Sequence, residues 1–169
     1  DPSNPSRNIS RVQNVSHLTT QGVELAWQAK SVGWKALDLQ SSLTYTDSLI
    51  VSNDNGYVST PGDTVGKQQP NVPTWRASAL GSYRFNDQWT GALGARYSGP
   101  QFRTLNNADV YGYTYQGVSE YFVVDLKASW KFSRQWTASF GIDNLNNNKH
   151  WNFHPYPQRA WYANLKGDF

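Results

Sequence analysis

Several kinds of residue and segment are missing from this sequence, and each absence excludes a class of protein. Its 169 residues contain no cysteine, so disulfide frameworks and thiolate metal sites are excluded. No stretch approaches the roughly 18 consecutive apolar residues of a membrane-spanning helix. Basic residues form no run, although the net charge is +3, and we expect no nucleic-acid partner.

Methionine is also absent, and the first residues do not form a signal peptide. We therefore expect a processed product or a piece of a longer chain. Aromatic residues, by contrast, are abundant: they make up 15% of the chain, while the mean hydropathy is only −0.68. A chain this polar and this aromatic needs a place for its rings other than a thick aliphatic core.

Alternating apolar and polar residues run through most of the chain and predict β-strands. In Pro73–Phe85, the rings of Trp75, Tyr83 and Phe85 share one face with small residues, and Arg76 and Arg84 lie on the other. The same pattern predicts strands at Ile9–Lys30, Trp34–Ile50, Trp89–Tyr97, Phe122–Phe132, Trp136–Ile142 and Trp161–Phe169, which gives seven in all.

The predicted connections alternate in length. Residues 31–33, 86–88 and 133–135 form short turns, whereas 51–71, 101–118 and 146–157 form longer loops. Two turn regions are near copies, YRFNDQWT at 83–90 and WKFSRQWT at 130–137. Short turns at one end and long loops at the other predict an antiparallel up-and-down sheet across a membrane, with periplasmic turns and extracellular loops.

Aromatic spacing separates a membrane barrel from a soluble β-sandwich with the same alternation. Trp75 and Phe85 lie ten residues apart on one face, as do Phe122 and Phe132. At a strand tilt near 45°, this separation spans about 24 Å, close to the apolar band of an outer-membrane barrel between its aromatic girdles. Bacterial single-chain barrels have even strand numbers, so we expect seven strands to be part of a larger barrel.

Short motifs in a fixed order add a family resemblance. They are GVEL at residues 22–25, PNVPTW at 70–75, GIDNL at 141–145 leading to Trp151, and PQR at 157–159 before the strand that ends in Phe169. Together they resemble roughly the carboxy-terminal third of the barrel of TonB-dependent outer-membrane receptors. One departure is Gly167, where the family usually has a larger apolar or aromatic side chain.

The resemblance implies an all-β fold, with residues 1–169 forming the carboxy-terminal segment of a barrel of about 22 strands. It implies the outer membrane of a Gram-negative bacterium, and uptake of a ferric siderophore or similar metal chelate as ligand, with no intrinsic cofactor. Implied partners are membrane lipid, a plug domain and amino-terminal strands absent from this sequence, TonB through a missing amino-terminal box, and the barrel-assembly machinery. The assembly signal would be the last strand with Trp161, Leu165 and Phe169.

Two long loops contain the candidate ligand-binding residues. In one, Tyr111, Tyr113 and Tyr115 follow Arg103, a combination suited to stacking on and pairing with an anionic chelate. The other contains His150, Trp151 and His154. Two histidines four residues apart suggest a metal pair only on a helix, so we predict contact with a bound chelate and no metal site. The alternative for the tyrosine loop is that its residues extend the strands above the membrane and form a girdle.

No catalytic residues are predicted. Histidine occurs only at positions 17, 150 and 154, and no nucleophile and base are paired by spacing. The chain is therefore expected not to be an enzyme. The alternative is a small stand-alone outer-membrane barrel, either a protease, a lipid A-modifying enzyme or a passive porin. Basic and acidic residues at Arg76, Arg84, Arg96, Asp125, Lys127, Lys131 and Lys166 are expected to line a polar lumen.

Overall fold

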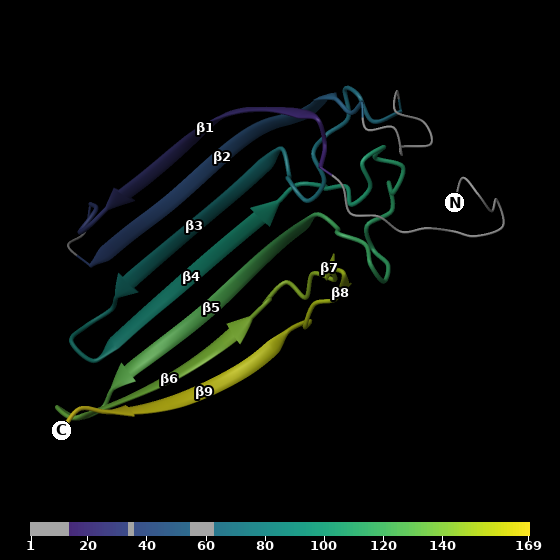
Figure 1. The fold of residues 1–169 in the computed structure, drawn as a ribbon. Helices are drawn as coiled ribbons and strands as arrows, with labels where there is room; N and C mark the ends of the chain where they lie inside the picture. The colour runs from purple at the N-terminus through teal and green to yellow at the C-terminus, as the bar shows by residue number, and fades with distance from the viewer. Residues whose placement is uncertain (1–13, 34–35, 55–62) are drawn as a thin grey trace.

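A computed structural model describes residues 14–33, 36–54 and 63–169. Seven antiparallel strands pair in the order in which they follow in sequence, and they form one curved sheet (Figure 1). They are β1 (His17–Ala29), β2 (Leu37–Ser52), β3 (Trp75–Arg84), β4 (Trp89–Ser98), β5 (Tyr121–Lys131), β6 (Trp136–Asp143) and β9 (Ala160–Gly167). The predicted up-and-down sheet is confirmed. No helix in the described ranges is long and apolar enough to cross a membrane.

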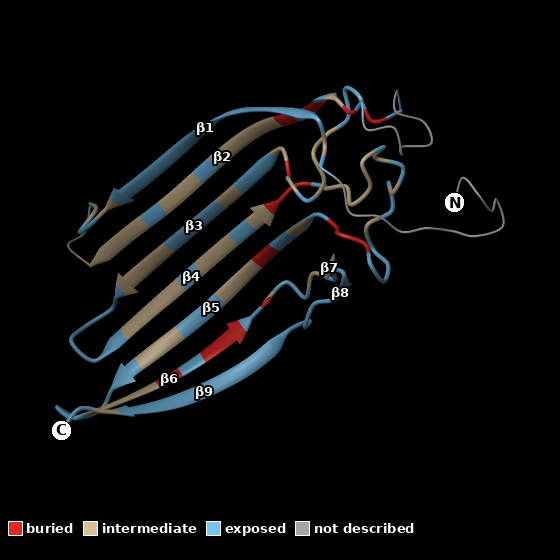
Figure 2. Ribbon diagram, in the orientation of Figure 1, coloured by how far each residue is buried: buried red, intermediate tan, exposed pale blue. Residues whose placement is uncertain are grey.

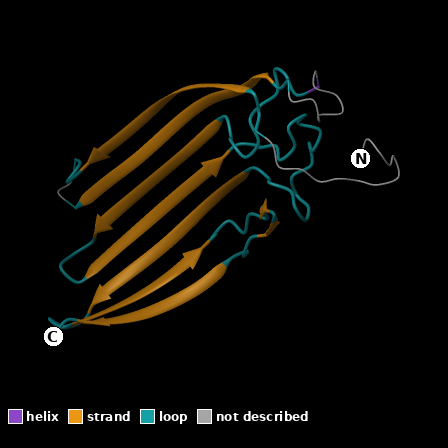
Figure 3. Cartoon of the chain, viewed as in Figure 1, coloured by secondary structure: helices purple, strands orange, loops and turns teal. Residues whose placement is uncertain are grey.

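Several predicted boundaries were wrong: β3 begins at Trp75 and not at Pro73, and β9 ends at Gly167 and not at Phe169. Within the described residues the first strand begins at His17, since 14–16 are not strand, and the predicted positions 9–13 and 34–35 lie outside the described residues. The second strand continues past Ile50 to Ser52, because pairing between β1 and β2 continues beyond the other strands. The region 146–157 is not a plain loop: it contains a short hairpin of β7 (Trp151–Asn152) and β8 (His154–Pro155), separate from the sheet (Figure 3).

Strand register places the predicted apolar residues of all seven strands on one face of the sheet. For example, Leu93 of β4 pairs with Gly81 of β3 and Leu126 of β5. These side chains are not covered: Leu93 is 53% exposed and Leu165 is 62% exposed. Figure 2 shows exposed and intermediate positions along most strands, with the buried ones gathered mainly toward the long-loop end. An uncovered apolar face is what contact with lipid requires.

Aromatic rings lie at both ends of this apolar face. At the short-turn end Trp89 and Trp130 stack with centroids 5.4 Å apart, and at the long-loop end the rings of Tyr45 and Trp75 lie 4.8 Å apart. The near-copy turns also share a geometry, because Asn86 and Ser133 each accept hydrogen bonds from the backbone N–H groups two and three residues later. The two predicted girdles are therefore present in the folded sheet.

Within the described residues, β1 and β9 each have only one strand neighbour. Backbone groups at an open edge cannot be left unpaired in hydrocarbon. The described sheet is open at both edges, as one part of a larger barrel wall would be.

The departure at Gly167 has a packing explanation. Gly167 pairs with Trp136 of β6, and a Cβ atom at Gly167 would lie 2.8 Å from the ring of Phe169 and 3.0 Å from that of Trp136. Those two rings meet edge to face, with centroids 5.4 Å apart. The space that an aromatic side chain at position 167 would occupy is thus filled by the ring of Trp136 from the neighbouring strand β6.

Because the Trp136 ring fills the space of a side chain at position 167, a second substitution at Trp136 should restore stability to a variant with a large residue at position 167. Gly167→Phe should destabilise the barrel by about 1–3 kcal/mol, because the new ring overlaps Trp136. Adding Trp136→Ala to that variant should recover most of the loss, whereas Trp136→Ala alone should be destabilising. Urea unfolding of the full-length barrel in lipid vesicles measures all three variants. Additive losses in the double variant would contradict this prediction.

Candidate ligand-binding site

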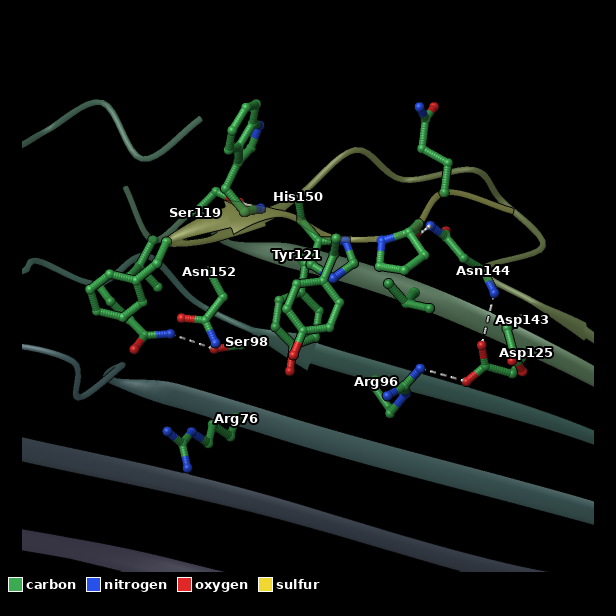
Figure 4. A pocket seen from close by; sticks show the side chains of 18 of the residues that line it. Arg76, Arg96, Ser98, Ser119, Tyr121, Asp125, Asp143, Asn144, His150 and Asn152 are labelled. Atoms are coloured by element: carbon green, nitrogen blue, oxygen red, sulfur yellow. Dashed lines mark hydrogen bonds and ion pairs between the residues drawn. The ribbon is translucent and has the colours of Figure 1, made fainter. Parts of the chain in front are cut away.

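A pocket of about 970 Å³ lies on the polar face of the sheet at the long-loop end (Figure 4). Strands β3 to β6 form its floor, through Arg76, Arg96, Asp125 and Asp143. Residues 150–158, which include the β7–β8 hairpin, lie on its other side. The pocket therefore faces what would be the lumen of the barrel, beneath a loop that turns inward.

An aromatic stack forms the middle of the pocket. The ring of His150 lies between those of Tyr121 and Tyr156, with centroid distances of 4.9 Å and 4.8 Å. Only 9% of His150 is exposed. Burial lowers the pKa of His150, and the nearby Arg96 lowers it further, although the Asn148 carbonyl works in the opposite direction. His150 is therefore favoured in its neutral form, which packs between two rings at a smaller desolvation cost than the charged imidazolium.

The floor of the pocket contains one ion pair. Arg96 contacts Asp125 with its guanidinium nitrogen 2.9 Å from the carboxylate oxygen. Asp125 also accepts a hydrogen bond of 2.9 Å from the backbone N–H of Asn144. Arg76, by contrast, has no ion pair or hydrogen-bond partner among the residues that the structure describes. Its charge is available to a ligand.

Asn144 fixes the base of the inward loop. Its side-chain oxygen accepts a bond of 2.7 Å from the Asn148 N–H, and its nitrogen donates to the Asn148 carbonyl at 2.8 Å and to the Pro157 carbonyl at 3.4 Å. Its backbone has φ 55°, a left-handed conformation that asparagine tolerates better than most residues. Only 4% of Asn144 is exposed, so these bonds are protected from water.

Backbone hydrogen bonds join the inward loop to the preceding long loop. Gln116 donates to the Phe153 carbonyl at 2.7 Å, Phe153 donates to Gly117 at 2.8 Å, and Ser119 donates to Trp151 at 3.0 Å. Phe153 makes the turn between β7 and β8 with φ 62°, which is unusual for a bulky residue. The two loops therefore form one hydrogen-bonded unit over the pocket.

The seven sequence-predicted binding residues do not come together in one site. Tyr115, Trp151 and His154 come together, with Tyr115 5.1 Å from Trp151 and 6.1 Å from His154 between ring centroids. Tyr111 and Tyr113 form a second pair 6.0 Å apart, and burial, with Glu120 and Tyr111, raises the pKa of Tyr113. Of the predicted residues, the pocket lining includes only His150 and Trp151.

Arg103 lies outside the pocket and stabilises the joined loops. Its guanidinium lies 5.6 Å from the ring centroid of Phe153, and its side chain donates to Gln116 at 3.5 Å. Its backbone N–H and that of Thr104 donate to Asp109. Burial would raise the pKa of Asp109, but these bonds and one from the Thr104 hydroxyl outweigh it, so the pKa is lowered.

Reasoning from sequence missed three pocket residues, Arg76, Arg96 and Tyr121, as ligand candidates, whereas Tyr156 was expected in the same aromatic loop as His150. Arg76 and Arg96 were predicted as ordinary lumen wall, and they do lie on the polar face. Tyr121 offered one signal: it is an aromatic residue opposite the lipid-facing Phe122, and so it faces the lumen. Tyr156 lies within the predicted loop, and its place against His150 depends on the hairpin.

Comparison with known proteins identifies the fold family. Residues 1–145 match the family described as TonB dependent receptor-like, beta-barrel. The chain belongs to the TonB-dependent receptor family. Receptors of this family are barrels of the Gram-negative outer membrane, and this is the location of the chain. The long loops of this receptor segment are thus extracellular and its short turns periplasmic. No curated protein matches the chain.

Solved structures of such receptors have the same fold. The siderophore receptor PiuA from Acinetobacter baumannii is 21% identical, with a TM-score of 0.68 over 89% of this chain and 20% of PiuA. The unliganded ferric citrate transporter FecA is 17% identical, with a TM-score of 0.71 over 88% and 24%. The copper transporter OprC is 20% identical, with a TM-score of 0.65 over 90% and 23%. This receptor segment thus spans about a fifth to a quarter of their length.

No three His, Asp or Glu side chains lie close enough together to hold a metal ion within the described part of the receptor segment. His150 and His154 have different surroundings: the first is buried in the pocket, and the second is exposed beside Tyr115.

The buried His150 predicts a pH dependence of this receptor loop. Since the folded-state pKa is below the unfolded value, the stabilising contribution is complete above the unfolded pKa of about 6.5 and is lost as the pH falls toward the folded value. The protection factors of the loop amides, which are hydrogen-exchange rates corrected for the intrinsic pH dependence of exchange, should therefore fall between pH 7.5 and pH 5, roughly the range over which histidine titrates. His150→Phe, which keeps the stack without a titrating group, should remove most of this dependence. An unchanged pH profile in that variant would contradict the prediction.

Proposed function

We propose that the protein is an outer-membrane receptor that takes up a ferric siderophore or similar metal chelate, energised through TonB. The observation that supports it most is the lumen-facing pocket of about 970 Å³ beneath the extracellular loops. Its aromatic stack offers a flat apolar surface, and its arginines offer charge-assisted hydrogen bonds. These are the contacts that suit a metal enclosed by an organic, partly ionised chelator.

We further propose that residues 1–169 form the carboxy-terminal segment of the barrel. The two sheet edges that the described strands leave open support this, because a barrel must close in hydrocarbon. The short share of each similar receptor that the chain covers also supports it. On this proposal a plug domain and the TonB-contacting segment belong to other parts of the protein, and Trp161, Leu165 and Phe169 belong to the strand recognised in barrel assembly.

The outer aromatic residues belong to the same proposal. Tyr111, Tyr113 and Tyr115, with Arg103 and His154, would meet a chelate first, because they lie on the exposed side of the joined loops. Tyr111 and Tyr115 are each 67% exposed. Trp151 and His150 connect this surface to the pocket. A small stand-alone barrel, whether enzyme or porin, has less support because the described sheet is open at both edges.

Uptake of radioactive iron by a strain lacking the receptor tests the proposal. Complementation with the full-length gene should restore uptake of at least one ferric chelate from a panel, and deletion of tonB should abolish it. Tyr121→Ala should weaken binding by about tenfold through loss of one stacking surface. Phe122→Ala, which removes the neighbouring ring on the lipid face, is the matched control and should leave affinity unchanged. The proposal fails when no chelate in the panel depends on the gene.

A further inference from the structure

The pocket floor has an unpaired charge at each end and a neutralised ion pair between them. Arg76 on β3 and Asp143 on β6 both line it, and neither has a side-chain partner among the described residues. Arg96 on β4 and Asp125 on β5 lie between them, and they neutralise each other in an ion pair of 2.9 Å. Figure 4 shows Arg76 and Asp143 at opposite ends of the drawn pocket. The floor is therefore dipolar.

Strand order sets the distance between the two free charges. β3, β4, β5 and β6 are consecutive neighbours in the sheet. Three strand spacings separate the Arg76 and Asp143 backbones across the sheet, and the register offsets them by about four residues along the strands. These two components, of about 14 Å and about 13 Å, put the backbones roughly 20 Å apart. Both side chains are exposed, and both belong to the lumen face, as the pairing of Arg76 with Ser98 and of Asp143 with Ala160 requires.

Neutral polar groups surround each charged end. Beside Arg76 the lining includes Asn71, Ser98 and Gln101, with Gln101 donating to the Ser98 hydroxyl at 3.3 Å. Beside Asp143 it includes Asn144 and Gln158. The stacked rings of Tyr121, His150 and Tyr156 occupy the space between. Among the described lining residues the other two charged side chains are Arg96, near Arg76, and Asp125, opposite Asp143, and they pair with each other.

We propose that this pocket selects a dipolar metal chelate, one with an anionic group at one end and a cationic amine at the other. Arg76 pairs with the anionic group, Asp143 pairs with the ammonium, and the chelate body lies against the aromatic stack. A purely anionic chelate would leave Asp143 opposite a like charge. This inference rests on the proposed function and adds the charge pattern of its ligand.

Three forms of one probe test the charge pattern. The dipolar probe is a linear ferric trihydroxamate with an ammonium at one end and a carboxylate at the other. Its N-acetylated form lacks the cation, and its amidated form lacks the anion. The full-length receptor should bind the dipolar form about tenfold more tightly than either modified form. Equal affinity for all three, or tighter binding of the N-acetylated form, overturns the inference.

Two variants test which residue binds which charged group of the probe. Asp143→Asn should bind the dipolar and N-acetylated probes equally while still discriminating against the amidated one. Arg76→Gln should show the reverse. Because each variant is judged by its own ratio of affinities, the amount of folded receptor does not enter. A variant that keeps the wild-type ratios overturns the assignment.

Failure of the inference is distinguishable from failure of the proposed function. If the receptor binds ferric chelates with no preference for the dipolar form, the inference is wrong but the proposed function stands. If it binds none of these probes and supports no TonB-dependent iron uptake, the inference and the proposed function are both wrong.

Discussion

Replacing Leu93 with arginine should destabilise the folded barrel by about 2–4 kcal/mol, because a cation would then face the middle of the bilayer. Leu93 is at the centre of β4 and pairs with Gly81 and Leu126 on the apolar face. Its side chain is 53% exposed. In water such exposure would make the substitution harmless, but in lipid the guanidinium has no water to solvate it.

Leu80→Arg is the matched control. Leu80 is also a half-exposed leucine, 43% exposed, in the middle of the adjacent strand β3. It pairs with Gln40 and Gly94 on the polar face, so an arginine there faces the lumen. We expect a cost of about 0–1 kcal/mol. Urea unfolding of the full-length receptor in lipid vesicles, followed by tryptophan fluorescence, measures both. Equal losses would contradict the assignment of the faces.

This pair of leucines also illustrates how the fold could be predicted from sequence. Leu80 is an apolar residue on the polar face, and a count of hydrophobic residues would misplace it. Its neighbours place it correctly, because Ala79 and Gly81 belong to the series that includes Trp75 and Tyr83. Side chains alternate strictly along a strand, so a few unambiguous positions determine all the others. The seven strands and their faces follow from this local rule.

The pocket could not be predicted in the same way, because it depends on contacts between segments far apart in sequence. The β7–β8 hairpin turns at Phe153, which adopts φ 62° without being a glycine or asparagine. The sequence at this turn therefore offers none of the glycine or asparagine residues from which a turn is usually predicted. This turn and the bonds to Gln116 and Gly117 place His150 inside and leave His154 outside. From sequence the two histidines were equivalent candidates.

Asn144 is the residue of the site whose replacement should have the largest effect on the inward loop. Asn144→Ala should lower the local free energy of opening by about 3 kcal/mol. Two short buried bonds to Asn148 would be lost, each contributing about 1 kcal/mol, and alanine in the left-handed region costs about 1 kcal/mol more. Hydrogen exchange of the Leu145 and Asn148 amides in the full-length receptor measures this opening.

Two further variants separate the contributions. Asn144→Gly also loses the side-chain bonds but tolerates the backbone conformation, so its cost should be about 2 kcal/mol. Asn147→Ala changes a second left-handed asparagine, with φ 52°, whose exposed side chain accepts a single bond of 3.1 Å from Arg159. Its cost should be about 1 kcal/mol. Equal effects at positions 144 and 147 would show that conformation, and not the buried bonds, holds the loop.

The same variant distinguishes the loop from the charged floor. Asp125 is bound by the backbone N–H of Asn144 and by Arg96, and neither contact needs the Asn144 side chain. Asn144→Ala should therefore weaken chelate binding through the His150 and Tyr156 surface alone, while the preference for a dipolar chelate set by Arg76 and Asp143 is kept. Loss of that preference in Asn144→Ala would mean that the loop, and not the strand floor, positions the charges of the ligand.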